Sequence, residues 1–145
     1  MLFGGKKTRR VARILIVEDE PLVAFDNEHF LNGEGFEIVG TVDSVTDAMR
    51  LLDNEEDLDL LLVDVSLSDG SGIDVARAAH GRGITVMFVT GNCPGEAKEF
   101  AAGCLSKPYP QRDLLAAINA VEAVIEGRKV PRKLPGGFSL FAKVA

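Results

Sequence analysis

Four short apolar runs, each followed by a polar residue that can bind or attack a ligand, constrain the fold more than any other feature of the sequence. Runs of this length and composition are typical of strands that are buried on both faces of a parallel sheet. The runs and the residues that follow them are 11–17 with Glu18 and Asp19, 58–63 with Asp64, 84–89 with Thr90, and 104–106 with Lys107. A further apolar run at 38–42 brings the predicted strands to five.

Segments with helical periodicity separate these runs. Pro21 suits the first turn of one helix and Ser44 can cap the next. A third helix is predicted to stop at Gly81, and a long amphipathic helix is predicted over 111–126. The segment 91–103 is short and contains Gly and Pro, so it has room for only about two turns of helix.

Strands and helices thus alternate five times, which indicates an α/β fold with right-handed crossovers and helices on both faces of the sheet. We predict a doubly wound, five-stranded parallel sheet with a short or irregular fourth helix. Such sheets bind ligands at the carboxyl ends of their strands. The polar residues that follow the strands are therefore expected to converge at one edge.

The residues expected at this edge have a consistent chemistry. Carboxylates about 5 Å apart, as predicted for Glu18, Asp19 and Asp64, repel each other by roughly 3 kcal/mol per pair at an effective dielectric of about 20. Such a cluster requires a cation, and oxygen ligands favour Mg²⁺. An Asp carboxylate can also attack phosphorus to form an acyl phosphate. Lys107 would add positive charge, and the Thr90 hydroxyl could donate to a phosphoryl oxygen.

Each residue alone also has an ordinary structural explanation. Acidic residues after a strand commonly cap helices or form a solvated rim, an Asp after an apolar run can begin a turn, and Thr is common at strand ends. The order of acid, acid, hydroxyl and lysine at the ends of the first, third, fourth and fifth strands favours the functional interpretation. His29 and His80 have no metal-ligating neighbours in the sequence and are interpreted as surface or packing residues.

Composition limits the remaining classes of function. A formal net charge of −6 and a pI near 4.9 argue against a nucleic-acid-binding surface. No apolar window is long enough for a membrane span, and the basic residues near the start are not joined to the apolar stretch expected of a signal peptide. Cys93 and Cys104 lack CxxC spacing and are expected to be reduced thiols in a cytoplasmic protein. Plain packing is favoured for both over the alternative of oxidant sensing. We expect a flexible basic N-terminus (1–10), one folded domain (11–127) and a flexible tail (128–145). The alternating apolar residues of the tail could instead dock on the domain or on a partner.

Over about 11–126 the sequence resembles the receiver domain of two-component response regulators, which has a flavodoxin-like (βα)5 fold. Gly72, eight residues after Asp64, matches a turn glycine of that family, and Lys107-Pro108 matches a peptide bond that is usually cis. The resemblance implies a phosphoacceptor, a Mg²⁺ site and two phosphoryl contacts. Asp64 would be the phosphoacceptor, and Thr90 and Lys107 would contact the phosphoryl group. The Mg²⁺ ligands would be Glu18, Asp19, Asp64 and the backbone carbonyl of Ser66.

Some positions depart from the common receiver pattern. Cys104 replaces an aromatic residue that usually lies three residues before the lysine, and Ser68 replaces a frequent proline. The sequence Phe88-Val89-Thr90-Gly91 resembles the signature of an atypical receiver group often called FAT GUY. Members of that group act with HWE or HisKA2 histidine kinases in alphaproteobacterial stress signalling, so the resemblance implies partners of this kind.

The resemblance leads us to expect a monomeric, single-domain response regulator without enzymatic turnover of its own. It would accept a phosphoryl group on Asp64 from a sensor histidine kinase or phosphotransfer protein and signal by binding a downstream protein. Three alternatives remain open: a phosphate sink or relay intermediate, a flavodoxin-like hydrolase, and an interaction module in which Asp64 has no role. The hydrolase is disfavoured because neither an Asp-x-Asp nucleophile motif after the first strand nor a Gly-x-x-x-x-Gly-Lys loop is present.

Overall fold

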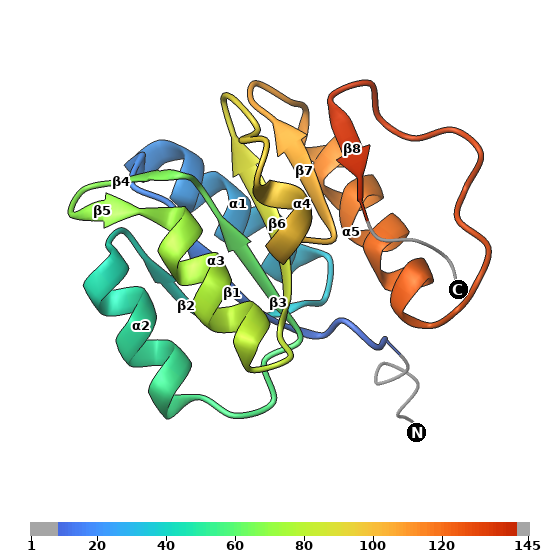
Figure 1. Ribbon diagram of the computed structural model, residues 1–145. Coiled ribbons are helices and arrows are strands. Elements are labelled where there is room, and N and C mark those ends of the chain that lie inside the picture. Colours follow the sequence, from blue (N-terminus) through green and yellow to red (C-terminus); the bar gives the residue numbers. More distant parts are fainter. Residues whose placement is uncertain (1–8, 142–145) are drawn as a thin grey trace.

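The computed structural model describes residues 9–141, so most of the predicted flexible N-terminus (1–8) and the last four residues of the predicted tail (142–145) lie outside this part. Strands and helices alternate through most of it (Figure 1). In chain order the elements are β1 (Arg13–Val17), α1 (Pro21–Gly33), β2 (Glu37–Val42), α2 (Val45–Asn54), β3 (Leu60–Val63), β4 (Ser66–Leu67), β5 (Gly70–Ser71), α3 (Gly72–Gly81), β6 (Thr85–Thr90), α4 (Ala97–Phe100), β7 (Gly103–Ser106), α5 (Gln111–Ile125) and β8 (Phe138–Leu140).

The central sheet has the strand order β2-β1-β3-β6-β7-β8, and its first five strands are parallel. This confirms the predicted doubly wound parallel sheet. The strand order reverses direction beside β1, because β2 lies on one side of it and β3 on the other. A cleft at the carboxyl ends of the strands is expected at such a switch point.

Side chains alternate between the two faces of each strand and build a separate core on each. On β1, Ile14 and Ile16 pack with residues of α1 and α5, whereas Leu15 and Val17 pack with residues of α2 and α3. The helices accordingly cover opposite faces of the sheet (Figure 1). β3 is completely buried, as its uninterrupted apolar run predicted.

Local signals in the sequence start and stop the helices as predicted. Pro21 is in the first turn of α1, and the Ser44 side chain accepts a hydrogen bond from the backbone N–H of Asp47 at the start of α2. Gly83, just beyond α3, has a φ of 78°, which a glycine adopts without strain. α4 is a single turn, so the short fourth helix is also confirmed.

The segment predicted as a flexible tail is corrected by the structure for residues 128–141. β8 pairs antiparallel with β7 and becomes the edge strand of the sheet, and the irregular chain before it packs Val130 and Leu134 on the core. Gly103 in β7 makes room for this addition, because a Cβ there would come within 2.7 Å of the Phe138 ring. A three-residue strand has too little alternation to be distinguished from a loop, which is why the sequence favours a flexible tail. The structure supports the alternative in which the tail docks on the domain.

We expect Phe138→Ala to destabilise the protein by about 2–4 kcal/mol, because it empties a site between β7 and α5 where the ring is only 8% exposed. Chemical denaturation measures the change. Ser139→Ala is the matched control in the same strand; its side chain is exposed and its loss should cost less than about 0.5 kcal/mol. Equal effects of the two substitutions would contradict the docking of β8.

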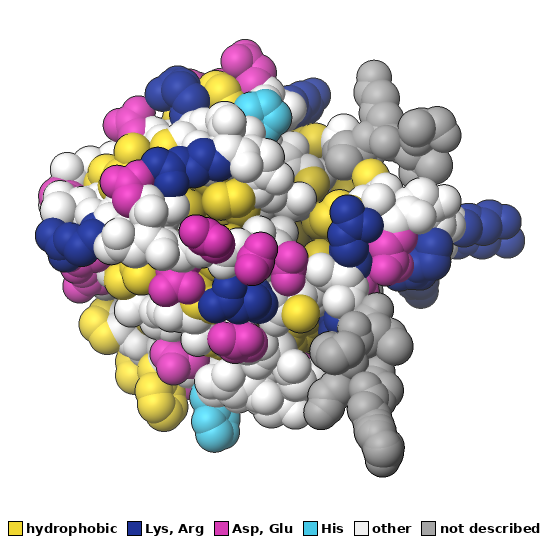
Figure 2. All heavy atoms as spheres, turned by 90° about the horizontal axis from the view of Figure 1, so that it is seen from below, with side chains coloured by type: hydrophobic (Ala, Val, Ile, Leu, Met, Phe, Trp, Pro, Cys, Tyr) yellow, Lys and Arg dark blue, Asp and Glu magenta, His cyan; other side chains and the backbone are white. Residues whose placement is uncertain are grey.

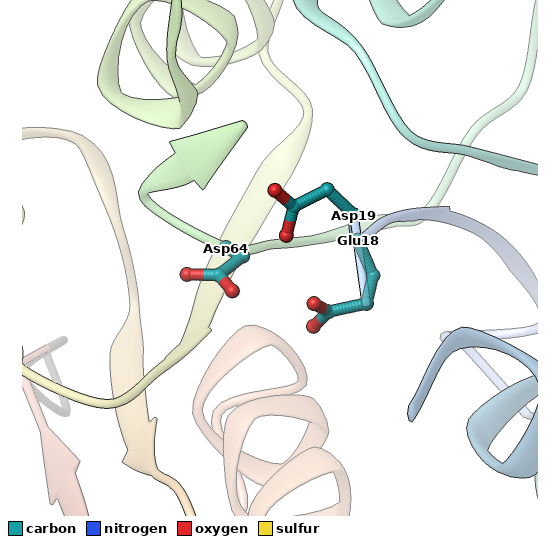
Figure 3. A group of neighbouring side chains, drawn as sticks. All are labelled: Glu18, Asp19 and Asp64. Atoms are coloured by element: carbon teal, nitrogen blue, oxygen red, sulfur yellow. The ribbon is translucent and has the colours of Figure 1, made fainter. Parts of the chain in front are cut away.

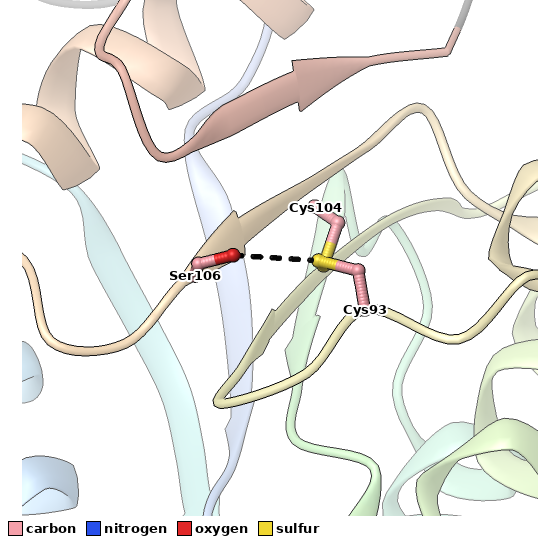
Figure 4. The surroundings of a disulfide bond; sticks show 3 residues. All are labelled: Cys93, Cys104 and Ser106. Atoms are coloured by element: carbon pink, nitrogen blue, oxygen red, sulfur yellow. Dashed lines mark hydrogen bonds between the residues drawn. A yellow bond between two sulfur atoms is a disulfide. The ribbon is translucent and has the colours of Figure 1, made fainter.

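The predicted reduced thiols are also corrected. Cys93, in the loop after β6, and Cys104, in β7, form a disulfide, and their Cα atoms are 6.2 Å apart (Figure 4). The pairing was missed because the two cysteines lie eleven positions apart, and only the path of the intervening loop brings them together.

Charged side chains of both signs are mixed on the surface viewed in Figure 2. Ion pairs link Arg13 at the start of β1 to Glu37 and Glu55, at 3.4 and 3.3 Å. Among residues 9–141, none of the helices has the length and apolar composition that crossing a bilayer requires.

Candidate functional site

Three carboxylates meet at the carboxyl ends of β1 and β3. Because Val17 pairs with Val63 in the parallel register, the next residues, Glu18 and Asp64, emerge side by side. One ligand atom from each of Glu18, Asp19 and Asp64 lies within 4.8 Å of the other two. Figure 3 shows the three side chains directed toward a common space. The convergence that the sequence predicted is therefore found.

Lys107 supplies the positive charge in this cluster. Its Nζ lies 2.8 Å from Oδ2 of Asp64, 2.9 and 3.0 Å from the two carboxylate oxygens of Glu18, and 2.9 Å from Oε1 of Glu20. The residue follows β7, and its backbone N–H donates to the Thr90 carbonyl. The peptide bond between Lys107 and Pro108 is cis, as the resemblance implied.

Thr90 and Ser66 complete the predicted set. Thr90 ends β6 and is 4% exposed, and its side chain lies near enough to Asp64 to lower the pKa of that carboxyl. Ser66 begins β4, and its backbone N–H lies 3.4 Å from Oδ1 of Asp64. Every residue predicted for the site therefore lies at the same edge of the sheet.

The environment shifts the pKa values of the two buried carboxyls, Glu18 and Asp64, in opposite directions. Burial raises the pKa of Glu18 above its ordinary value, and the hydrogen bond from Lys107 offsets this only in part. Burial acts in the same sense on Asp64, but hydrogen bonds with Lys107 and Thr90 outweigh it, so the pKa of Asp64 lies below its ordinary value. Asp64 is thus held as the anion, which is the form that can act as a nucleophile.

Lys107 remains an ammonium ion in this environment. Burial lowers its pKa, but the carboxylates of Asp64, Glu18 and Glu20 outweigh that effect and raise the pKa above the ordinary lysine value. The site therefore contains a fixed cation in direct contact with the ionised Asp64.

Two contacts at the site were not singled out in the sequence. Glu20 is a third partner of Lys107, and its position in the acidic run before Pro21 was the available signal. Tyr109, two residues after Lys107, exchanges hydrogen bonds with the buried Asn27 side chain of α1 at 2.9 and 3.2 Å. This pair ties the loop that carries Lys107 to α1.

The carboxylate cluster opens into a cleft of about 1610 Å³ between the start of α1 and the loops after β6 and β7. Large apolar side chains are exposed on α1 beside it: Leu22, which lines the cleft, is 78% exposed and Phe25 is 65% exposed. The Phe25 ring stacks on His29 with centroids 6.0 Å apart. Asp64 thus lines a cleft that is flanked by an apolar surface.

Comparison with known proteins identifies the family. Residues 14–119 match the response regulator receiver domain. The chain belongs to this family. The match covers β1 to most of α5 and contains all the site residues described above. This confirms the receiver resemblance found in the sequence.

Individual relatives agree with this assignment. The receiver domain is 32% identical over 112 residues to the phyllosphere-induced regulator PhyR of Methylorubrum extorquens and 34% identical over 116 residues to the cell cycle transcriptional regulator CtrA of Caulobacter vibrioides. These alignments cover 73% and 75% of this chain but only 42% and 49% of the two relatives. The chain thus spans less than half of each relative.

A solved CheY-like receiver domain from Methanospirillum hungatei superimposes on the structure with a TM-score of 0.71 at 28% identity. The superposition covers 80% of this chain and 97% of the other. The flavodoxin-like receiver fold that the sequence implied is therefore confirmed.

Proposed function

We propose that this receiver domain is a response regulator that accepts a phosphoryl group on Asp64 in a two-component phosphorelay. The observation that carries the proposal is the ionised Asp64 carboxylate, held 2.8 Å from Lys107 and facing Glu18 and Asp19 at the mouth of an open cleft. A carboxylate poised in this way is suited to nucleophilic attack on phosphorus.

The proposed step exchanges one bond to phosphorus for another. A carboxylate oxygen of Asp64 attacks the phosphorus of a phosphohistidine; the new O–P bond forms as the P–N bond breaks, and the imidazole of the donor keeps the electron pair and takes up a proton. Lys107 and the Thr90 hydroxyl hold the transferred oxygens. Lys107 already contacts Asp64, so it needs little reorganisation to do so.

The donor set fits Mg²⁺. Three carboxylates offer hard oxygen atoms within 4.8 Å of one another, and the cleft leaves room for the water and phosphate ligands that this ion retains. We assign Glu18, Asp19, Asp64 and the backbone carbonyl of Ser66 as its ligands. When bound, the ion neutralises charge on the phosphoryl oxygens.

Adding Mg²⁺ should stabilise the folded protein. When the free Mg²⁺ concentration is ten times the dissociation constant, binding adds about 1.4 kcal/mol to the free energy of unfolding, which corresponds to a rise in Tm of about 5 °C. Differential scanning fluorimetry with Mg²⁺ and then with a chelator measures the shift. Asp19→Asn should remove most of it. Asp26→Asn, at another cleft residue, is the control and should retain it; equal shifts in both variants would refute the assigned ligands.

Incubation with acetyl phosphate, with and without Mg²⁺, tests the proposed function. We expect one added phosphoryl group, mapped by mass spectrometry to the peptide that contains Asp64, and only in the presence of Mg²⁺. Label on another residue, or no label under any condition, would overturn the proposal.

The exposed apolar face of α1 supports a protein as the phosphoryl donor. Leu22 and Phe25 are exposed beside the nucleophile, and large exposed apolar side chains mark protein-binding surfaces. We propose a sensor histidine kinase or phosphotransfer protein in the cytoplasm as the donor. The 88–91 signature favours a kinase of the HWE or HisKA2 type and a role in stress signalling.

Substituting Leu22 separates protein docking from chemistry. Leu22→Glu should slow phosphoryl transfer from a histidine kinase by at least about 10-fold, because a charge replaces an apolar contact. Phosphorylation by acetyl phosphate should change little, since the small donor needs no docking surface. Leu22→Met is the control and should transfer normally. Equal slowing of both donors would place the effect at the reaction site instead.

A further inference from the structure

The disulfide joins two elements whose neighbouring residues contact Asp64. Cys93 lies three residues after Thr90, and Cys104 lies three residues before Lys107. The two strands are paired here, with Thr90 opposite Ser106, and the Lys107 N–H donates to the Thr90 carbonyl. The disulfide therefore links the start of the segment 91–103 to β7, immediately next to the site.

The first half of that segment has few other anchors in the described structure. The backbone hydrogen bonds recorded for 91–101 stay inside the segment, such as Ala97 N–H to Pro94 carbonyl. A Cβ added at Gly91 or Gly95 would meet nothing within 4 Å. Besides the disulfide, the Cys93 Sγ approaches the Ser106 hydroxyl at 3.8 Å (Figure 4), and the Cys93 side chain packs on the edge of the core.

The second half is held by packing. Ala97 is fully buried, and Phe100 lies under the Arg77 guanidinium, 4.9 Å from its ring centroid, and edge-on to His80. Breaking the disulfide would therefore release 91–96 while α4 stays in place. Thr90 directly precedes these residues, so its position would no longer be restrained by the crosslink at Cys93.

The two sulfur atoms differ in access. Cys104 is fully buried in β7, whereas Cys93 is partly exposed on the loop. An external thiol or disulfide can reach only the Cys93 side, and exchange through one accessible sulfur is how dithiol pairs are oxidised and reduced. Disulfides in cytoplasmic proteins are mostly transient and redox-sensing rather than permanent.

We propose that Cys93 and Cys104 form a reversible redox modification site that controls the freedom of residues 91–96 beside Asp64. A low-molecular-weight disulfide RSSR is the oxidant. The Cys93 thiolate attacks it and releases one RSH, and Cys104 then attacks the Cys93 sulfur and releases the second. The two protein thiols lose two protons and two electrons in total, and both are recovered in the two RSH molecules. An excess of RSH drives the reverse reaction.

Equilibration of the full chain in glutathione buffers of varied reduced-to-oxidised ratio tests the chemistry. Free thiols are trapped with a maleimide in denaturant and counted by mass. We expect a two-electron transition between two labels and none. Cys93→Ser and Cys104→Ala should each carry one label in reduced glutathione and show no such transition. Two labels at every ratio, or none at any ratio, would overturn the proposal.

Amide exchange tests the structural consequence. Reduction should accelerate amide exchange at 92–96 by at least about 10-fold, because the crosslink no longer restrains local opening of these residues. The exchange rates in α2 should stay unchanged. Cys93→Ser should exchange at the reduced rate under oxidising conditions. Equal rates in the oxidised and reduced wild type would overturn the proposed control of this segment.

The effect on phosphorylation rests on the proposed function and is measured separately. Reduced protein should be phosphorylated by acetyl phosphate at least about 3-fold faster than oxidised protein, because Thr90 can then follow the incoming phosphoryl oxygen. Equal rates in the two forms would overturn this effect. The glutathione titration is repeated on Asp64→Asn, in which the redox transition should persist. A failed phosphorylation assay with an intact transition would therefore count against Asp64 as acceptor and not against the redox site.

Discussion

Replacing Asp64 with Asn should abolish phosphorylation of the receiver domain by acetyl phosphate and by any histidine kinase. The amide of Asn is neutral and a poor nucleophile, so no acyl phosphate forms. The substitution also removes the carboxylate that lies 2.8 Å from Lys107. Phosphate-affinity electrophoresis and intact-protein mass spectrometry measure the loss.

A matched control separates loss of the nucleophile from loss of charge. Asp69→Asn removes another carboxylate, from the turn between β4 and β5. The Asp69 carboxylate accepts hydrogen bonds from the N–H groups of Val45 and Thr46, away from Lys107. This variant should still be phosphorylated. Continued labelling of Asp64→Asn at the wild-type rate would move the acceptor to another residue and end the proposed mechanism.

Gly72→Ala should be the most destabilising glycine-to-alanine substitution among residues 9–141. A Cβ at Gly72 would overlap the carbonyl oxygen of Asp64 and stand 2.8 Å from its carbonyl carbon. Both atoms belong to the backbone, and the Gly72 N–H is committed to the Val65 carbonyl at 2.7 Å, so neither side can yield cheaply. We expect a loss of more than about 3 kcal/mol.

Chemical denaturation measures that loss, and acetyl phosphate labelling of the folded fraction should also fall because β3 must shift at Asp64. Gly81→Ala, at the other end of α3, is the control. A Cβ there meets nothing within 4 Å, so the change should be neutral or stabilising by up to about 1 kcal/mol. Similar stabilities of the two variants would contradict the close approach of α3 to Asp64.

The parts of the fold that the sequence predicted are those where a long pattern and a local signal agree. The apolar run 60–63 is buried on all sides, and the serine at 44 caps a helix as its residue type suggests. The site followed from topology, because parallel strands bring residues 18, 64 and 107 to one edge whatever the loops do. The chemical roles of these residues remain predictions.

The features that were missed depend on contacts without a local pattern. β8 pairs Phe138 with Leu105, thirty-three positions earlier. The Phe138 ring packs where a side chain at position 103 would otherwise stand, so the docking of β8 depends on Gly103. The hairpin of β4 and β5 has two residues in each strand, too few for any periodicity. The pairing of Cys93 with Cys104 depends on the course of a loop, which composition does not determine.

The late position of β8 in the chain has a consequence for the order of assembly. The parallel sheet and its helices are complete by residue 125, so the ribosome releases everything they need before Phe138 emerges. β8 then joins a framework that already exists, and as the edge strand it forms hydrogen bonds with only one neighbouring strand, β7. It is therefore the element most able to detach and return while the rest of the molecule stays folded.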